Sequence, residues 1–264
     1  MENKVIVITG SSRGIGYGLA EAFLSLGCSV MVSGRKEETV GKALAGLKSR
    51  FEAEKVFGLV CDVTNPAQVQ AMWDRSVERF GKVDVWVNNA GWSGEPGMVW
   101  ERPESELSGV IATNLLGMAY GSQIAMRGML AQGFGSIYNM EGMGSDGRKH
   151  AGLTMYGASK YAVHYFTESL ALEAKETPVI IGSLRPGMVV TKLITDRYKD
   201  RPEEWGRAKK IFNIIAERVE NVTPWLAKRM LANQKNGAVL SYSSNWKLLW
   251  RLVSQPFVRR NLFQ

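Results

Sequence analysis

The chain has 264 residues, of which 45% are hydrophobic and 22% are charged, and this balance excludes an intrinsically disordered protein. Its 33 basic and 25 acidic side chains leave a net charge of +8, which favours anionic partners such as nucleotide phosphates or acidic substrates. The basic residues are dispersed, and no zinc finger or aromatic RNA-binding signature occurs. Nucleic acid is therefore the weaker interpretation of the charge.

The cysteine content indicates a reducing compartment. Cys28 and Cys61 are too few for a disulfide framework or a four-ligand zinc site, and we expect a cytoplasmic protein. No group of His, Cys and carboxylate residues has metal-ligand spacing, so no metal is expected. No run of about 18 apolar residues occurs, so no transmembrane helix is expected, and the first residues lack the features of a signal peptide.

Short apolar runs rich in β-branched residues alternate with longer stretches of helical periodicity. The expected strands, in chain order, are Val5–Thr9, Ser29–Ser33, Val56–Cys61, Val83–Asn88, Ser136–Asn139, Val179–Leu184 and Ala238–Tyr242. The expected helices are Gly14–Leu26, Glu37–Phe51, Pro66–Phe80, Glu104–Ala131, Thr154–Lys175 and Pro224–Asn233. The alternation predicts an α/β Rossmann fold, a doubly wound parallel seven-stranded sheet with helices on both faces.

A single domain over residues 1–264 accounts for nearly the whole chain. Residues 189–220 are expected to form an inserted substrate loop or lid, and residues 243–264 a C-terminal tail. Within the tail, Trp246–Val253 is amphipathic and basic. We expect it to pack on a neighbouring subunit of a homo-oligomer, a dimer or tetramer, and peripheral contact with a membrane surface is the second interpretation.

A glycine-rich turn follows the first expected strand and precedes a helix. Glycines let the backbone turn tightly and approach a pyrophosphate, and the helix N-terminus supplies free N–H groups. The pattern predicts a phosphate-binding loop formed by Gly10, Ser12, Arg13, Gly14, Ile15 and Gly16. Its Gly-x3-Gly-x-Gly spacing differs from the Gly-x-Gly-x2-Gly dinucleotide fingerprint, and an ordinary turn between strand and helix is the alternative.

The end of the second expected strand indicates which nucleotide binds. An NAD site would carry a carboxylate there to accept a hydrogen bond from the ribose, whereas this chain has Arg35 and Lys36. Together with Arg13, these cations would pair with a 2′-phosphate, so NADPH/NADP+ is the expected cofactor. The alternative is that Arg35 and Lys36 only begin a solvated helix. Asp62 and Val63, after the third strand, are expected beside the adenine.

Several motifs, in order over about residues 4–242, resemble those of the classical short-chain dehydrogenase/reductase family. The segment Asn88–Gly91 resembles its structural motif, and the spacing of Tyr156 and Lys160 resembles its Tyr-x3-Lys motif. The resemblance implies a reductase with catalytic Tyr156, Lys160 and Asn114. It also implies cofactor contacts from these residues: Asn89, Ala90, Gly91, Tyr156, Lys160, Pro186, Gly187, Val189 and Thr191.

The chemistry of the Tyr156–Lys160 pair also follows from the residues themselves. Four positions apart on a helix, the two side chains share one face. A nearby ammonium favours the phenolate and lowers the tyrosine pKa, so the phenol can protonate an alkoxide that forms when hydride reaches a carbonyl. Lys160 is also expected to hold the nicotinamide ribose, and Asn114 to anchor a water that continues the proton path.

One position departs from the family pattern. Where the family carries a serine at the end of the fifth strand, this chain has Gly142. The missing hydroxyl removes one hydrogen bond to the substrate oxygen. Ser145 is one candidate replacement, and a water or a backbone N–H is another. We expect glycine here to leave room for a bulky, rigid substrate.

The segments Tyr138–Ser145, Arg185–Leu193 and Lys210–Glu217 resemble the chlorophyll(ide) b reductase branch of that family. This implies NADPH-dependent reduction of a ring formyl group to hydroxymethyl on a chlorophyll-type macrocycle. Gly142, Trp92 and Met188 are the expected substrate contacts, with packing at the rim or core as the alternative for Trp92. A general ketone, aldehyde or 3-oxoacyl reductase is the second candidate, and a non-catalytic NADP-binding regulator is the third.

Overall fold

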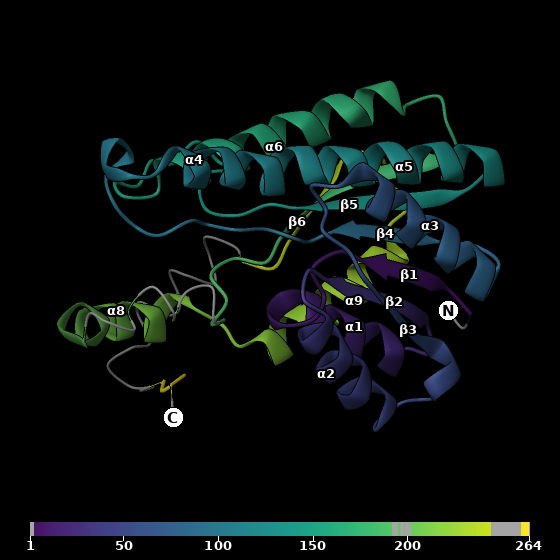
Figure 1. Ribbon diagram of the computed structural model, residues 1–264, viewed down its shortest axis with the longest axis horizontal. Coiled ribbons are helices and arrows are strands. Elements are labelled where there is room, and N and C mark those ends of the chain that lie inside the picture. Colours follow the sequence, from purple (N-terminus) through teal and green to yellow (C-terminus); the bar gives the residue numbers. More distant parts are fainter. Residues whose placement is uncertain (1–2, 192–194, 196–197, 199–201, 244–259, 264) are drawn as a thin grey trace.

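Seven parallel strands form one sheet in the order β3-β2-β1-β4-β5-β6-β7. The strands are β1 (Val5–Ile8), β2 (Ser29–Gly34), β3 (Val56–Val60), β4 (Val85–Asn88), β5 (Gly135–Met140), β6 (Val179–Arg185) and β7 (Ala238–Ser241). The computed structural model describes residues 3–191, 195, 198, 202–243 and 260–263 (Figure 1). All seven predicted strands and their parallel pairing are confirmed.

Helices cover both faces of the sheet, as predicted. One face is covered by α1 (Gly14–Ser25), α2 (Glu37–Lys48) and α9 (Val219–Ala232) (Figure 1). The other is covered by α3 (Pro66–Phe80), α4 (Glu104–Ile111), α5 (Gly117–Gln132) and α6 (Thr154–Glu173). Successive residues of β1 therefore enter different cores: Ile6 and Ile8 pack toward α1, and Val7 packs toward α3 and α5. Burial on both sides explains why the strands are continuously apolar.

The long helix predicted over Glu104–Ala131 is interrupted. A π-helical turn, Ala112–Leu116, joins α4 to α5. The extra residue of such a turn carries Asn114 into the protein, where the side chain is completely buried. The apolar periodicity continues through the turn, so it gives no sign of the change in helical geometry.

The last helix begins earlier than predicted. The structure starts α9 at Val219, so Pro224 lies inside the helix rather than at its first position. A proline at this depth leaves the carbonyl of Glu220 without its helical N–H partner. Glu220 is exposed to solvent, where water can satisfy that carbonyl.

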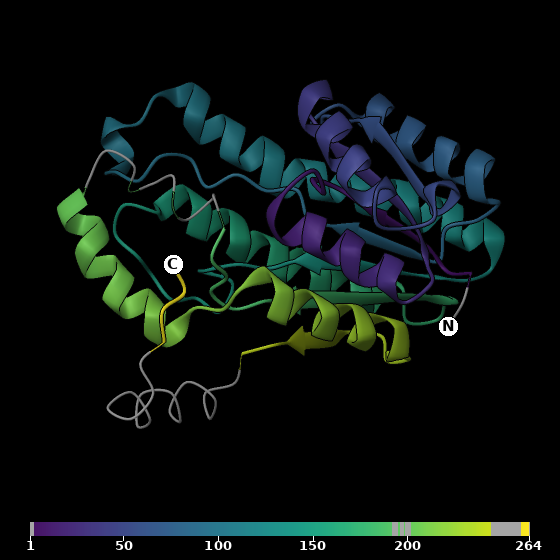
Figure 2. The same ribbon diagram turned by 90° about the horizontal axis from the view of Figure 1, so that it is seen from below.

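The insertion at residues 189–220 contains α8 (Pro202–Ile215), which lies beyond the carboxyl ends of the strands (Figures 1 and 2). Its two ends are joined where Val189 pairs with Glu217. Residues 260–263 return to α8, and Phe263 packs edge-on against Trp205 with ring centroids 4.8 Å apart. The predicted amphipathic segment Trp246–Val253 lies outside the described residues. No helix in the described ranges is both long and apolar enough to cross a bilayer.

Two helical glycines provide a matched test of packing between α3 and α5. A Cβ on Gly128 of α5 would lie 1.9 Å from the Trp73 ring of α3, whereas a Cβ on Gly41 of α2 would meet nothing within 4 Å. We expect Gly128→Ala to lower the free energy of unfolding by about 1–3 kcal/mol through overpacking. Gly41→Ala should raise it by about 0.5–1 kcal/mol, because alanine restricts the unfolded chain. Urea unfolding measures both, and equal effects would contradict this account of the interface.

Candidate active site

Asn89 ties the ends of β1 and β4 together. Its Nδ2 donates to the carbonyls of Thr9 and Gly10, at 3.0 Å each. The backbone N–H groups of Asn89 and Ala90 both donate to Thr9 Oγ1, also at 3.0 Å. The predicted motif after β4 therefore holds the glycine-rich loop after β1 in place, at the point where the strand order reverses. Ligands of open α/β sheets bind at this reversal point.

The glycines of the loop are required by close backbone contacts. A Cβ on Gly10 would lie 2.8 Å from Ala90 Cα, and a Cβ on Gly16 would lie 2.6 Å from the Gly10 carbonyl oxygen. Gly10 and Gly14 have positive φ angles of 61° and 60°. No side chain caps the N-terminus of α1 at Arg13, so the first N–H groups of the helix remain available to an anion.

The three predicted cations surround this loop as free charges. Arg13, Arg35 and Lys36 are exposed, and none forms an ion pair within the described part of the chain. The loop geometry, the uncapped helix and this charge fit the pyrophosphate and the 2′-phosphate of NADP. The same residues offer no carboxylate to a ribose hydroxyl at the end of β2.

The other predicted cofactor residues differ in what they can offer. Thr191 reaches the loop, because a Cβ on Gly14 would lie 3.6 Å from its Cγ2. Gly187, after β6, has a φ of 76°, a backbone conformation that favours glycine. Asp62 accepts hydrogen bonds from Thr64, whereas the Val63 side chain is buried. Pro186, Val189, Ser12 and Ile15 line the same end of the sheet, where the side chains of Pro186 and Val189 are buried.

The predicted catalytic residues converge beside Gly91, at the end of β4. A Cβ on Gly91 would lie 3.4 Å from Asn114 Oδ1 and 3.6 Å from Lys160 Nζ. Asn114 accepts from the Trp92 N–H at 2.7 Å and donates to the Trp92 carbonyl and to Ser159 Oγ. Both of its N–H groups are thus used within the protein. Asn114 therefore joins the loop after β4 to α6, and the water predicted on it could not rest on these donors.

Lys160 is a buried cation directed at the end of β5. Its Nζ donates to the Met140 carbonyl at 2.9 Å and lies 5.9 Å from the centre of the Tyr156 ring. Burial lowers the pKa of the Lys160 ammonium to about 8, and the negative charge of Glu141 opposes that shift. Near neutral pH the side chain is therefore mostly charged, which stabilises a phenolate on Tyr156.

A buried cluster of ionisable side chains lies behind the Tyr156–Lys160 pair, and the sequence patterns did not predict it. Glu141 accepts hydrogen bonds from Arg185, and its Oε1 lies 3.0 Å from His164 Nδ1. The side chain of Glu141 is only 1% exposed. The available signal was a charged residue directly after an apolar strand. Its partners are 23 and 44 residues away and carry no local sign of the contact.

Gly142 is directly opposite the Tyr156 hydroxyl. A Cβ at position 142 would lie 2.5 Å from that oxygen, closer than any real Cβ contact. The Tyr156 hydroxyl therefore occupies the space that a side chain at position 142 would take, and the expectation that glycine leaves room for a bulky substrate stays a prediction. Ser145 is also committed elsewhere: its Oγ donates to the Gly142 carbonyl at 2.7 Å and accepts from the Gly142 N–H at 3.0 Å. Neither that hydroxyl nor that N–H is free to replace the missing serine.

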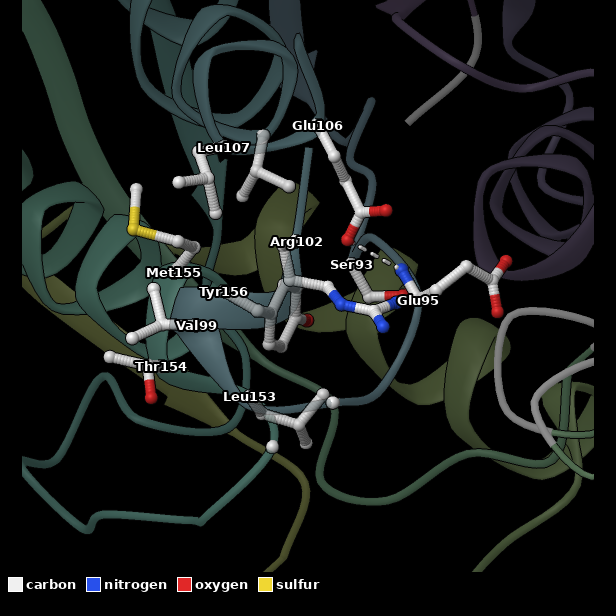
Figure 3. A pocket seen from close by; sticks show the side chains of 13 residues that line it. Ser93, Glu95, Val99, Arg102, Glu106, Leu107, Leu153, Thr154, Met155 and Tyr156 are labelled. Atoms are coloured by element: carbon white, nitrogen blue, oxygen red, sulfur yellow. Dashed lines mark hydrogen bonds between the residues drawn. The ribbon is translucent and has the colours of Figure 1, made fainter. Parts of the chain in front are cut away.

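A pocket borders Tyr156 on the side of α4. Its apolar wall comes from Val99, Leu107, Val110, Leu153 and Met155 (Figure 3). Arg102 lines the same pocket, and its buried Nε has no hydrogen-bond partner among the described residues. Glu106 is also in the wall, where its Oε1 accepts from the Glu95 N–H at 3.1 Å. The pocket thus combines an apolar surface, the phenol and an unpaired donor.

Two of the predicted substrate contacts, Trp92 and Met188, are not among the residues that line this pocket. The Trp92 ring packs on α4, since a Cβ on Gly109 would lie 2.7 Å from it. Met188 packs against the apolar cluster formed by Ala208, Phe212 and Ala216 at α8. Trp100 is 79% exposed in the short helical turn Val99–Glu101, next to the pocket. Among the described residues, no group of three His, Cys, Asp or Glu side chains could hold a metal ion.

Comparison with known proteins agrees with this geometry. The family model described as short chain dehydrogenase matches residues 4–202. Chlorophyll(ide) b reductase NOL of Arabidopsis thaliana is 36% identical over 241 residues, covering 89% of this chain and 67% of that protein. The probable chlorophyll(ide) b reductase NYC1 of the same plant is 31% identical over 274 residues, covering 98% of this chain and 54% of that protein. The chain thus spans about two thirds of NOL and about half of NYC1.

Among solved structures, an actinorhodin polyketide ketoreductase with NADPH superposes with a TM-score of 0.81 at 27% identity, covering 92% of this chain and 97% of that one. Similarity to proteins with different substrates supports a shared fold and reaction type but does not select one substrate.

The contact between Gly142 and Tyr156 generates a test. We expect Gly142→Ala to lower kcat/KM for carbonyl reduction by about tenfold to a hundredfold, because the added methyl displaces the phenol. Gly157→Ala is the matched control, since a Cβ on Gly157, next to Tyr156 on α6, meets nothing within 4 Å. Steady-state kinetics of both variants would measure the difference. A Gly142→Ala enzyme as fast as wild type would refute the steric account.

Proposed function

The chain belongs to the short-chain dehydrogenase family, and from this membership we propose that it is an NADPH-dependent carbonyl reductase acting on a ring formyl group. The observation that carries the proposal is the Tyr156–Lys160 pair beside the glycine-rich loop. The two side chains come from one face of α6. The loop follows β1, and Asn89 joins it by hydrogen bonds to the segment that follows β4.

The reaction is divided among a few side chains. NADPH, when bound, supplies the hydride that reduces the carbonyl carbon. The Tyr156 phenol donates its proton to the carbonyl oxygen as negative charge develops there. The Lys160 ammonium, 5.9 Å from the tyrosine ring centre, stabilises the phenolate that remains. Asn114 keeps the loop after β4 against α6, which fixes the wall opposite these two groups.

The proposed cofactor preference rests on charge at the end of β2. Arg35 and Lys36 are exposed, and Arg13 stands at the start of α1 across the loop. A guanidinium pairs with a phosphate through two parallel hydrogen bonds, which NADPH can use and NADH cannot. The ketoreductase solved with NADPH, which has the same fold, supports this assignment.

The proposed substrate is the formyl group of a chlorophyll-type macrocycle. Two chlorophyll(ide) b reductases are among the relatives of this chain, at 36% and 31% identity, and the matches cover 89% and 98% of it. Trp100 and Met98, 79% and 43% exposed, form an apolar rim beside the pocket on which a flat ring could rest. The formyl group would enter the pocket toward Tyr156 while the macrocycle remained at its mouth.

A general aldehyde or ketone reductase is the second candidate, favoured by the pocket itself. Its cavity volume is only about 20 Å³, which leaves space for a small group and none for a macrocycle. The unpaired Arg102 Nε would donate to an acceptor group on such a substrate. This candidate uses the same tyrosine, lysine and cofactor. The two candidates differ only in the substrate, so an assay with both kinds of substrate separates them.

We also propose a homo-oligomer in a reducing compartment such as the cytoplasm. Tyr161, Tyr165 and Leu172 of α6 are 56%, 71% and 76% exposed, an apolar surface suited to a second copy of the chain. Both Cys28 and Cys61 are free, buried thiols. Burial raises the pKa of each to about 11, so neither is a reactive thiolate.

Cofactor choice provides the first test of this function. Wild-type protein should bind NADPH at least about tenfold more tightly than NADH, and Arg35→Asp should reverse the preference by repelling the 2′-phosphate. Arg127→Asp is the charge-matched control, since Arg127 is exposed near the C-terminal end of α5, away from the loop. Fluorescence titration gives the dissociation constants. Equal wild-type affinity for the two cofactors would contradict the assignment.

The substrate assay tests the reaction. NADPH oxidation would be followed with chlorophyllide b, chlorophyll b and benzaldehyde, and the hydroxymethyl product would be identified by mass spectrometry. We expect reduction of the formyl macrocycle, and at least about a hundredfold loss in Tyr156→Phe, because the proton donor is removed. NADPH affinity should change little in that variant.

Each other outcome has a distinct meaning. Reduction of benzaldehyde alone would favour the general reductase. Tight NADPH binding without reduction of any carbonyl would favour the regulator. A Tyr156→Phe variant that retains its rate would show that the proton comes from another group.

A further inference from the structure

Glu141 is a buried carboxylate placed directly between two parts of the candidate active site. It follows β5, and its N–H donates to the Leu184 carbonyl at 2.9 Å. Before it stands Met140, whose carbonyl accepts from Lys160 Nζ, and after it stands Gly142, opposite the Tyr156 hydroxyl. Any shift of Glu141 would therefore move both backbone contacts of the catalytic pair.

The carboxylate is held by two side chains from two other elements. Arg185, at the end of β6, donates to it through Nε and, at 3.4 Å, through Nη2. His164 of α6 lies four residues beyond Lys160, with its Nδ1 3.0 Å from Glu141 Oε1. The Arg185 side chain is 35% exposed and Glu141 only 1%, so the cluster connects the buried site to solvent through the arginine.

The charged groups that face Lys160 come from three elements. Tyr156 and His164 lie one turn away on either side along α6, Glu141 faces it from the end of β5, and Arg185 stands behind Glu141 on β6. On the β4 side, Gly91 and Asn114 are uncharged. The Glu141 charge favours the charged form of this ammonium, which donates to the carbonyl of the residue directly before Glu141.

We propose that Glu141 is a positioning residue whose carboxylate keeps Lys160 charged and aligned beside Tyr156, and that Arg185 sets how strongly that carboxylate acts. The electrostatic part has a definite sign. Without the Glu141 charge, Lys160 is left near an unneutralised Arg185, and the charged form of Lys160 becomes less favourable. Without the Arg185 charge, Glu141 attracts Lys160 more strongly, and the charged form of Lys160 becomes more favourable.

The opposite signs distinguish this role from a structural one. Two variants that only loosened the packing behind α6 would impair the site in the same way. The importance of Lys160 for catalysis rests on the proposed function, whereas its charge state can be measured on the protein alone.

The experiment is a pH titration of the cofactor-free protein labelled with [ε-13C]lysine. Lys160→Arg would identify the Lys160 resonance. We expect a wild-type pKa of about 8. Glu141→Gln should lower the pKa of Lys160 by about one unit, and Arg185→Gln should raise it by a similar amount. The double variant should return near the wild-type value. Glu168→Gln is the control, because Glu168 is 64% exposed and contacts only the far nitrogen of His164, at 3.4 Å.

The pH profile of kcat/KM for reduction provides the second readout. Reduction requires protonated Tyr156 and charged Lys160, and both are lost at high pH, so the high-pH limb reports the coupled pair. That limb should move to lower pH in Glu141→Gln and to higher pH in Arg185→Gln. The shifts should match those of the titration in direction.

Shifts of the same sign in the two variants, or no shift in either, would overturn the proposal and leave Glu141 a structural residue. If Glu141→Gln fails to fold, Arg185→Gln alone tests the proposal. An upward shift of the Lys160 pKa in that variant would support the proposal, and no upward shift would overturn it. If Lys160 titrates as expected but no carbonyl is reduced, the proposed function fails and the electrostatic role of Glu141 stands.

Discussion

The approach of β1 to β4 at their carboxyl ends is the constraint on which the rest of the site depends. The strand order reverses here. A Cβ at position 10 would lie only 2.8 Å from Ala90 Cα, so the close approach requires glycine. The Asn89 side chain bonds the two strand ends together across this contact. The phosphate loop lies on one side of the junction and the Tyr156–Lys160 pair on the other. A cofactor spanning the junction would therefore meet both parts in fixed relative positions.

The second determinant is the placement of charge in an otherwise apolar core. Lys160 and Glu141 are both buried where β5 ends against α6. Removing an ion from water costs several kcal/mol, which a buried partner offsets only with good geometry. Such a cluster is weak evidence for added stability. Its value lies in holding an ammonium next to a phenol, at a cost met by the two hydrophobic layers on either side of the sheet.

The glycine at position 142 changes how the site is completed. A side chain there would collide with the Tyr156 hydroxyl, while the Gly142 N–H and carbonyl are both satisfied by Ser145. The tyrosine therefore sits against bare backbone rather than against a hydroxyl group. Tyr156 stands in the wall of the pocket that also contains Arg102, so the phenol and the Arg102 Nε are two of the polar groups that line it.

The sequence by itself determined the sheet, its parallel order of βαβ units, the glycine-rich loop and the four-residue spacing of Tyr156 and Lys160. Each of these depends on short-range patterns: continuous apolar runs, turn glycines and helical periodicity. Only the tertiary structure decided the π-helical turn at Asn114, the early start of α9 and the Glu141–Arg185–His164 cluster. The cluster depends on how α6 docks on β5 and β6, which joins residues up to 44 positions apart. Local pattern reports which face is buried, but not which distant side chain will satisfy a buried charge.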